Sequence, residues 1–139
     1  MLDTEALFGL NPRDRRHGET LGSLEELRKK GQRIYAPDST LLEFQAVLRG
    51  VGRRPSTVRA AILGLRKVLE LNGVEEAGTM GTGLFARQCE LEEAYGLTYF
   101  DSLVAASVLS LDGELVSDDE AFERVPGVTR TPLAAGREP

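Results

Sequence analysis

Helix-forming patterns occupy five segments of the chain. The clearest is residues 56–73, where apolar residues recur at the spacing of one helix face and Asn72-Gly73 supplies a stop signal. Residues 100–113 are apolar on nearly all sides, which predicts a helix buried inside the domain. Further helices are expected over residues 23–31, 39–50 and 84–95.

Short segments with the composition of strands lie between these helices. They are residues 33–37, 114–117 and 127–131, and the opening "MLDT" reads as the end of a very short strand. Residues 11–20 are polar, basic and rich in turn residues, so a loop is expected there. Short strands alternating with helices predict one α/β domain over residues 1–139 with a mostly parallel sheet.

The apolar segments are too short for a membrane protein. The longest run, residues 102–111, is half the roughly 20 residues that a membrane span needs. No basic segment followed by an apolar stretch opens the chain, so no signal peptide is expected. Cys89 is the only cysteine, which excludes an intramolecular disulfide and a cysteine zinc cluster. These features fit a cytoplasmic protein.

The net charge of −5 argues against a protein that coats nucleic acid non-specifically, because such proteins usually carry a basic surface. Basic residues nevertheless cluster, at residues 13–17, 28–30, 53–54 and 66–67. Two divalent ions held by four acids would also neutralise most of the negative charge. The charge balance therefore disfavours a non-specific binder more than it disfavours a metal-dependent nuclease.

Acidic residues follow two of the predicted strands. Asp3 comes after the first strand, and Asp118 and Asp119 come directly after the strand at 114–117. Ligands of open α/β sheets bind at the carboxyl ends of the strands, which is where these acids fall. Each also has an ordinary interpretation, because Asp is common as an N-cap and in solvated turns.

Two further acids lie near the starts of predicted helices. Glu43 has capping-box spacing to Thr40, but it is flanked by apolar residues and has no basic residue at helical spacing before Arg49. A cap and a metal ligand are equally good interpretations of Glu43 from these residues alone. Asp101 suits an N-cap of the apolar helix that follows, yet a carboxylate at the mouth of a buried helix is costly unless it is neutralised.

Taken together, four acids at the ends of separate elements suggest a shared site. Hard divalent cations such as Mg²⁺ and Mn²⁺ take oxygen ligands, usually a few carboxylates together with water and substrate phosphate. Such an ion activates water and stabilises the charge that develops on a phosphate being cleaved. The acids therefore predict a site for one or two of these ions.

The pattern of these acids resembles the PIN-domain family, and especially the VapC-type toxins of toxin–antitoxin pairs. The resemblance spans nearly the whole chain and rests on "LDTEALFGL", "APDSTLLEFQAVL", "LTYFDSLVAASVL" and "ELVSDDEAFERVPGV". The last two stretches are the more specific, because they combine an acid-headed helix, a strand and the pattern S-x-D-x-x-F. The first strand has only two residues before Asp3, fewer than relatives usually show.

The resemblance implies a fold, an activity and a set of site residues. The fold would be a three-layer sandwich with a central, mostly parallel five-stranded sheet flanked by helices. The activity would be endonucleolytic hydrolysis of RNA by a water that Mg²⁺ or Mn²⁺ activates. Both the metal ligands and the catalytic residues would be Asp3, Glu43, Asp101 and Asp119.

The family pattern also ranks the neighbours of these acids. It favours Asp119 over Asp118 as the fourth ligand, with Ser117 assisting and Phe122 in the core. Thr4 adds a second oxygen beside Asp3. Asp118 is expected either to contact an outer-sphere water or to be exposed.

Substrate and partner contacts are less well determined by the sequence. The basic side chains after Asp3, namely Arg13, Arg15 and Arg16, are candidates to hold RNA, although charge runs are usually just solvated. The helices after Ser39 and Ser56 are candidates to bind an antitoxin or a second subunit of a homodimer, although their apolar residues are equally typical of core.

Two other interpretations compete with the nuclease. A haloacid-dehalogenase-like phosphatase also has an aspartate after its first strand, but it wants a second aspartate where Glu5 stands, and it leaves Glu43 and Asp101 without a role. A degenerate, catalytically weak domain would bind RNA or a protein without cleaving. His17 is the only histidine, which excludes a two-histidine ribonuclease mechanism within one chain.

Overall fold

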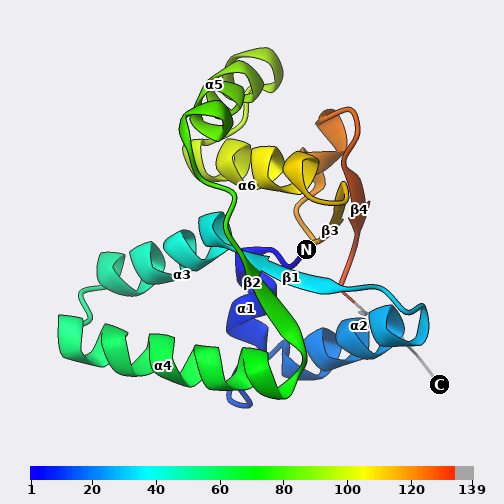
Figure 1. Ribbon diagram of the computed structural model, residues 1–139. Coiled ribbons are helices and arrows are strands. Elements are labelled where there is room, and N and C mark those ends of the chain that lie inside the picture. Colours follow the sequence, from blue (N-terminus) through cyan, green and yellow to red (C-terminus); the bar gives the residue numbers. More distant parts are fainter. Residues whose placement is uncertain (134–139) are drawn as a thin grey trace.

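The computed structural model describes residues 1–133 of the 139-residue chain, so the last six residues of the expected single domain lie outside it. Four strands, six α-helices and one 3₁₀-helix alternate along this part (Figure 1). The strands are β1 (Ile34–Pro37), β2 (Val74–Ala77), β3 (Glu114–Val116) and β4 (Thr129–Thr131). The helices are α1 (Thr4–Gly9), α2 (His17–Lys29), α3 (Asp38–Gly50), α4 (Pro55–Leu71), α5 (Thr82–Tyr95), α6 (Tyr99–Ser110) and η1 (Glu120–Arg124).

Most of the predicted elements are confirmed. The predictions over 39–50, 56–73, 84–95 and 100–113 correspond to α3, α4, α5 and α6, and the three predicted strands correspond to β1, β3 and β4. Every residue of α6 from Ser102 to Val108 is buried, as its all-round apolar pattern indicates. No helix among the described residues combines the length and apolar character that a bilayer crossing requires.

The sequence patterns missed or misplaced three elements. The loop predicted over 11–20 is wrong from His17 onward, because α2 begins there. The buried residues of α2 are the small Thr20, Gly22 and Ser23 and only one large apolar residue, Leu24. The short helix α1 was not expected. Strand β2 was also missed, since only Val74 of its four residues is buried and its sequence has no apolar alternation.

The sheet differs from the expected five strands. Within residues 1–133, β1 pairs with β2 and β3 pairs with β4, both in parallel, and no continuous five-stranded sheet forms. The first residues connect the two pairs, because Leu2 forms an isolated bridge with Val116 and donates its N–H to the Tyr35 carbonyl at 2.8 Å. The α/β class is therefore confirmed, but the central five-stranded sheet is not, because among the described residues Leu2 forms only an isolated bridge between the two strand pairs.

Two hydrophobic clusters lie on either side of this opening segment. One lies among α1, α2, α3, α4 and the β1–β2 pair, and the other among α5, α6, β3 and η1. Met1 belongs to the second cluster and Leu2 to the first, as expected for an extended segment whose side chains alternate. Figure 1 shows α1, α2 and α4 on one side of β1 and α5 and α6 on the other. The third residue, Asp3, therefore emerges at the junction of the two clusters.

A close contact between Gly9 and Thr20 sets how α1 packs on α2. A Cβ atom added at Gly9 would lie 2.0 Å from Thr20 Oγ1 and 3.0 Å from Thr20 Cβ. Thr20 is fully buried, and its hydroxyl has no hydrogen-bond partner among the described residues. A glycine at position 9 thus lets the helix that follows Asp3 approach its neighbour.

We predict that Gly9→Ala lowers the free energy of unfolding by about 1–3 kcal/mol, because the added methyl group overpacks this contact. Thr20→Ala in the same chain should recover part of the loss by removing the clashing hydroxyl. Urea unfolding would measure both effects. Gly18→Ala is the control, because a Cβ at that α2 position meets nothing within 4 Å and should be neutral or stabilising. An unchanged stability of Gly9→Ala would contradict the packing argument.

Candidate active site

Asp3 lies at the junction of the two clusters, and its carboxylate is held on both sides. The side chain is 8% exposed. Its Oδ1 accepts the Thr4 N–H at 2.8 Å, which caps α1, and its Oδ2 accepts the Ser117 hydroxyl at 2.5 Å. The N-cap interpretation of Asp3 therefore holds, and it is compatible with a place in a site.

Burial raises the pKa of Asp3 to about 7, well above its ordinary value of 3.8. The hydrogen bonds from Ser117 and from the Thr4 backbone oppose this rise in pKa, whereas the nearby charges of Glu5 and Glu43 add to it. Asp3 is thus a buried carboxyl group that faces other acids, and its proton is only half lost near neutral pH.

Glu43 reaches the same place from α3. Its Oε1 accepts a hydrogen bond from the Thr4 hydroxyl. It does not act as a capping-box partner, because the Thr40 hydroxyl donates to the Pro37 carbonyl and α3 has no side-chain cap. Burial raises the pKa of Glu43, the Thr4 hydroxyl lowers it, and the charges of Asp101 and Asp119 raise it further. Glu43 therefore faces α1 and the other acids.

Asp101 comes from the first turn of α6, but it is not the N-cap. That position belongs to Thr98, whose Oγ1 accepts the Asp101 N–H at 3.2 Å. Burial is the main cause of a raised pKa at Asp101, and the charge of Asp119 is the next. The charge of Arg124 lowers the same pKa. The carboxylate of Asp101 is therefore partly buried and lies close enough to Asp119 to feel its charge.

Asp119 is the most exposed of the four acids and caps η1. Its Oδ1 accepts the Ala121 N–H at 2.9 Å, and its own N–H donates to Ser117 Oγ at 3.1 Å. Ser117 thus contacts both Asp3 and Asp119. Phe122, three residues after Asp119, is fully buried, as expected.

The structure brings the four acids into mutual electrostatic contact from four different elements. Glu43 is the common neighbour, because Asp3, Asp101 and Asp119 all interact with its charge. Within residues 1–133, however, no three Asp, Glu, His or Cys side chains are arranged so that they could hold a metal ion together. Two of the carboxylates instead accept hydrogen bonds from Thr4 and Ser117. The donor set is all oxygen and anionic, which is the chemistry that hard divalent cations prefer.

Glu5 is a fifth acid at this place, and we did not expect it from the sequence as part of a metal site. Burial raises the pKa of Glu5, and the charge of Asp119 contributes to the rise while Arg16 opposes it. Its Oε1 accepts the Asp118 N–H at 2.5 Å and lies 3.4 Å from the Ser117 hydroxyl. The only signal in the sequence is its place two residues after Asp3, at the start of α1.

Asp118 is not simply exposed, whereas its contact with an outer-sphere water stays a prediction. It is partly buried, its Oδ2 pairs with Arg16, and its Oδ1 accepts the Leu133 N–H at 2.8 Å. Of the three arginines considered for substrate binding, Arg13 and Arg15 are exposed, whereas Arg16 is ion-paired. A substrate role remains a prediction for all three arginines, of which Arg16 alone takes part in ion pairs among the described residues.

Comparisons with known proteins agree with this fold. In a search of solved structures, the chain is similar to one described as VapBC2 from Rickettsia felis bound to a DNA fragment from its promoter, with a TM-score of 0.67 and 20% sequence identity. The alignment covers 95% of this chain and 96% of that one. A search of curated proteins gives no match. The pattern of the PIN domain matches residues 1–128. Because this match takes in nearly the whole chain and all four acids, the chain belongs to the PIN-domain family.

Proposed function

We propose that this protein is a divalent-metal-dependent endoribonuclease of the VapC type, the toxin of a toxin–antitoxin pair. Membership of the PIN-domain family supports a nuclease in general terms. The observation that carries the finer proposal is the group of acids on α3 and α6 and at the starts of α1 and η1, where burial and neighbouring carboxylate charges raise the pKa of Asp3, Glu43 and Asp101. A cluster of like charges is unfavourable unless a cation arrives.

Asp3, Glu43, Asp101 and Asp119 would hold Mg²⁺ or Mn²⁺. The bound ion would supply Lewis acidity for the hydrolysis of an RNA phosphodiester. Because these side chains do not converge as a ready coordination shell, ion binding would require the carboxylates to turn away from their present donors. Thr4 and Ser117 hold two of these carboxylates by hydroxyl groups, which rotate more readily than backbone donors.

The raised pKa of Asp3 has a direct consequence for ion binding. A carboxylate ligand must be deprotonated, so a cation and the proton compete for Asp3. The raised pKa of Asp3 therefore makes ion binding release a proton near neutral pH. The buried position of Asp3 also keeps bulk water away from one side of the site.

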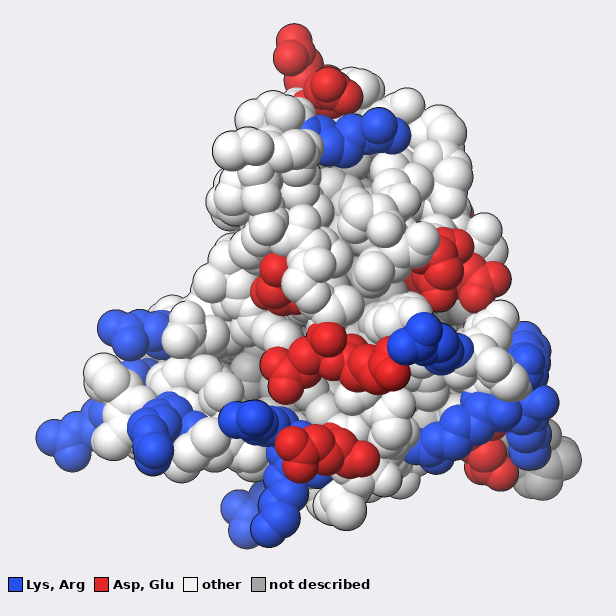
Figure 2. All heavy atoms as spheres, viewed as in Figure 1, with Lys and Arg blue, Asp and Glu red and all other residues white. Residues whose placement is uncertain are grey.

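Basic side chains would bind the RNA backbone outside the acidic centre. Arg13 and Arg15 are exposed in the segment that follows α1. Figure 2 shows further Lys and Arg side chains gathered at two ends of one face, over α3 and α4 on one side and over α2 on the other. The net charge of −5 thus conceals separate basic regions, which can contact phosphates.

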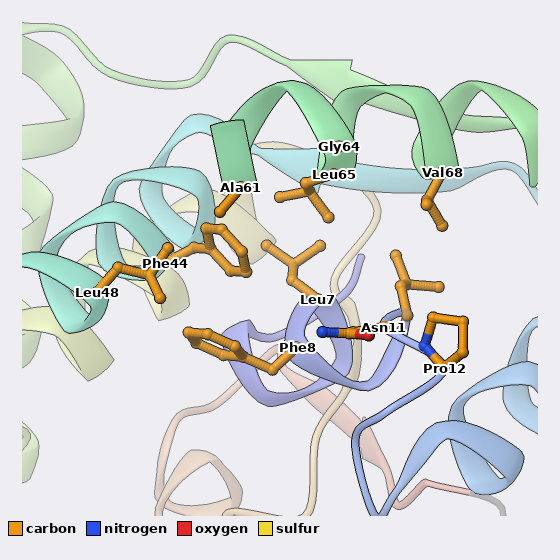
Figure 3. A pocket seen from close by; sticks show the side chains of 11 residues that line it. Leu7, Phe8, Asn11, Pro12, Phe44, Leu48, Ala61, Gly64, Leu65 and Val68 are labelled. Carbon is orange, nitrogen blue, oxygen red and sulfur yellow. The ribbon is translucent and has the colours of Figure 1, made fainter. Parts of the chain in front are cut away.

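An antitoxin helix is the partner that best fits the groove between α1, α3 and α4. This groove has a volume of about 360 Å³ and is lined mainly by apolar side chains, with Phe8 stacked on Phe44 at 4.4 Å between ring centroids (Figure 3). Leu42, Val47 and Leu63 lie exposed on the same two helices, α3 and α4, while Leu65 and Leu69 are core. The resemblance to VapC-type toxins implies an antitoxin partner, and the similar solved structure is described as VapBC2 bound to promoter DNA. We further propose that a second copy of the chain binds through the exposed residues Leu42, Val47 and Leu63 to form a homodimer.

A binding module that does not cleave is the remaining alternative. It would keep the fold and the groove but would not respond to Mg²⁺ or Mn²⁺. The haloacid-dehalogenase-like phosphatase has no support, because the PIN domain matches residues 1–128.

We predict that Asp101→Asn and Asp119→Asn each lower RNA cleavage at least ~100-fold, because removal of a ligand should cost no less than the loss of a residue that supports one. Neither change should destabilise the metal-free protein, since each relieves repulsion between like charges and an Asn at position 119 can still cap η1. Cleavage of labelled RNA in Mn²⁺ and thermal unfolding in EDTA would measure the two effects. Glu93→Gln, on the exposed face of α5, is the control. Full cleavage by both variants would contradict the site.

We predict that metal-free protein loses stability as the pH rises from about 4 to about 7. The pKa of Asp3 is about 7 in the folded state and ordinarily 3.8, so the folded state binds its proton more tightly and ionisation favours unfolding over this range. Asp3→Asn should remove a large part of that decline. Urea unfolding in EDTA across this pH range would measure the difference between wild type and variant. If the free energy of unfolding fell with pH equally in both proteins, the pKa of Asp3 would not be raised in the folded state.

We predict that Gly64→Arg abolishes binding of a co-expressed antitoxin without reducing RNA cleavage. Gly64 lines the groove (Figure 3), and a Cβ atom added there meets nothing within 4 Å, so we expect an arginine to obstruct the groove without disturbing the core. Co-purification would measure the bound antitoxin. Gly83→Arg, on α5, has the same space around it and should bind normally. Equal binding by the two variants would place the antitoxin elsewhere.

A further inference from the structure

Arg16 connects three parts of the chain through its guanidinium group. Each of its three nitrogens contacts a different carboxylate: Nε contacts Glu19 at 2.9 Å, Nη1 contacts Glu5 at 3.5 Å, and Nη2 contacts Asp118. Glu5 belongs to α1, Glu19 to α2, and Asp118 to the connection between β3 and η1. The Arg16 side chain is 22% exposed, so these ion pairs are partly shielded from water.

The Asp118 end of this network adjoins the acidic site through Glu5 and through the chain neighbours Ser117 and Asp119. Asp118 also donates its N–H to Glu5 Oε1 at 2.5 Å and accepts the Leu133 N–H at 2.8 Å. Its neighbours in the chain are Ser117, which donates to Asp3, and Asp119, which is the fourth acid. The interactions that hold Asp118 in place therefore also hold the backbone of its neighbours Ser117 and Asp119.

We propose that Arg16 is a positioning residue for Asp119 and Ser117, and not a contact for the RNA backbone. This inference rests on the proposed function, because it assigns Asp119 to the metal site. The planar guanidinium group of Arg16 has N–H donors that point toward three carboxylates in different directions. A lysine ammonium has the same charge but not this planar arrangement of donors. Partly buried ion pairs that share one cation form a network, whose loss costs more than the loss of a single exposed pair.

The surroundings of Arg16 also disfavour a phosphate contact. A phosphate that approached Arg16 would meet the negative charges of Glu5, Glu19 and Asp118 at the same nitrogens. Arg15 is exposed one residue earlier in the chain and is free of this conflict, because no ion pair involves it among the described residues. The two arginines should therefore behave differently when they are replaced.

Kinetics of Arg16→Met, Asp118→Asn and the double variant separate the two roles. A positioning role predicts that each single change lowers kcat for RNA cleavage by about 10- to 100-fold with KM nearly unchanged, the cost typical of a residue that supports a ligand. The double variant should be no slower than the slower single variant, because both changes break the same ion pair. Arg15→Met should instead raise KM and reduce its dependence on salt.

A phosphate contact predicts the opposite response at Asp118. Asp118→Asn would then release Arg16 toward RNA and lower KM, and Arg16→Met would raise KM while kcat stays the same. Either result would overturn the positioning role. Arg16→Lys, which keeps the charge but not the shape, should recover only part of kcat.

Amide hydrogen exchange tests the inference without metal or RNA. In Arg16→Met, the amides of residues 117–121 should exchange at least tenfold faster than in wild type, while those of α4 stay unchanged and show that the protein is folded. Unchanged exchange over residues 117–121 would overturn the positioning role. A wild-type protein that neither cleaves RNA nor binds Mn²⁺ by calorimetry would instead overturn the proposed function, so the two failures are distinguishable.

Discussion

The hydrogen bond from the Ser117 hydroxyl to Asp3 joins residues that are 114 positions apart in the chain. It lies where the opening segment passes between β1 and β3, with one hydrophobic cluster on each side. Because the extended residues Met1 and Leu2 point into opposite clusters, the backbone at Asp3 is fixed from both sides. The proposed site depends on this placement, since Thr4, Glu43 and Asp119 take their positions relative to it.

Negative charge is the dominant electrostatic feature of this junction. Burial and mutual repulsion raise the pKa of Asp3, Glu5, Glu43 and Asp101 alike. Arginines partly balance these acids from the periphery. Arg16 pairs with Glu5 and Asp118, and Arg130 donates to the Ser117 carbonyl at 3.0 Å while it pairs with Glu123. These arginines stabilise the connection after β3, but within residues 1–133 no ion pair involves Glu43, Asp101 or Asp119. A divalent cation would balance the charge of these acids.

The groove and the acidic site share two helices, α1 and α3. Phe8 lies one turn after Thr4 on α1, and Phe44 is adjacent to Glu43 on α3, so the stacked rings line the groove while Thr4 and Glu43 bond to each other. A helix that occupied the groove would contact α1 and α3 next to the residues that carry the acids. Partner binding and catalysis are therefore expected to be physically close in this protein.

The sequence by itself determined the class of fold and the helices with clear apolar periodicity, and it predicted which four acids form the proposed site. These follow from local patterns, because an amphipathic helix and an acid after a strand are visible within a few residues. It did not determine β2, α1 or the start of α2, where small or exposed residues carry no periodic signal and where contacts such as Gly9 against Thr20 fix the geometry. Only the tertiary structure decided that Glu43 bonds to Thr4 rather than to its own helix, that Glu5 joins the acids, and that Arg16 pairs with Asp118. Each of these depends on contacts between distant segments, and side-chain pairing over such separations leaves no mark in the local sequence.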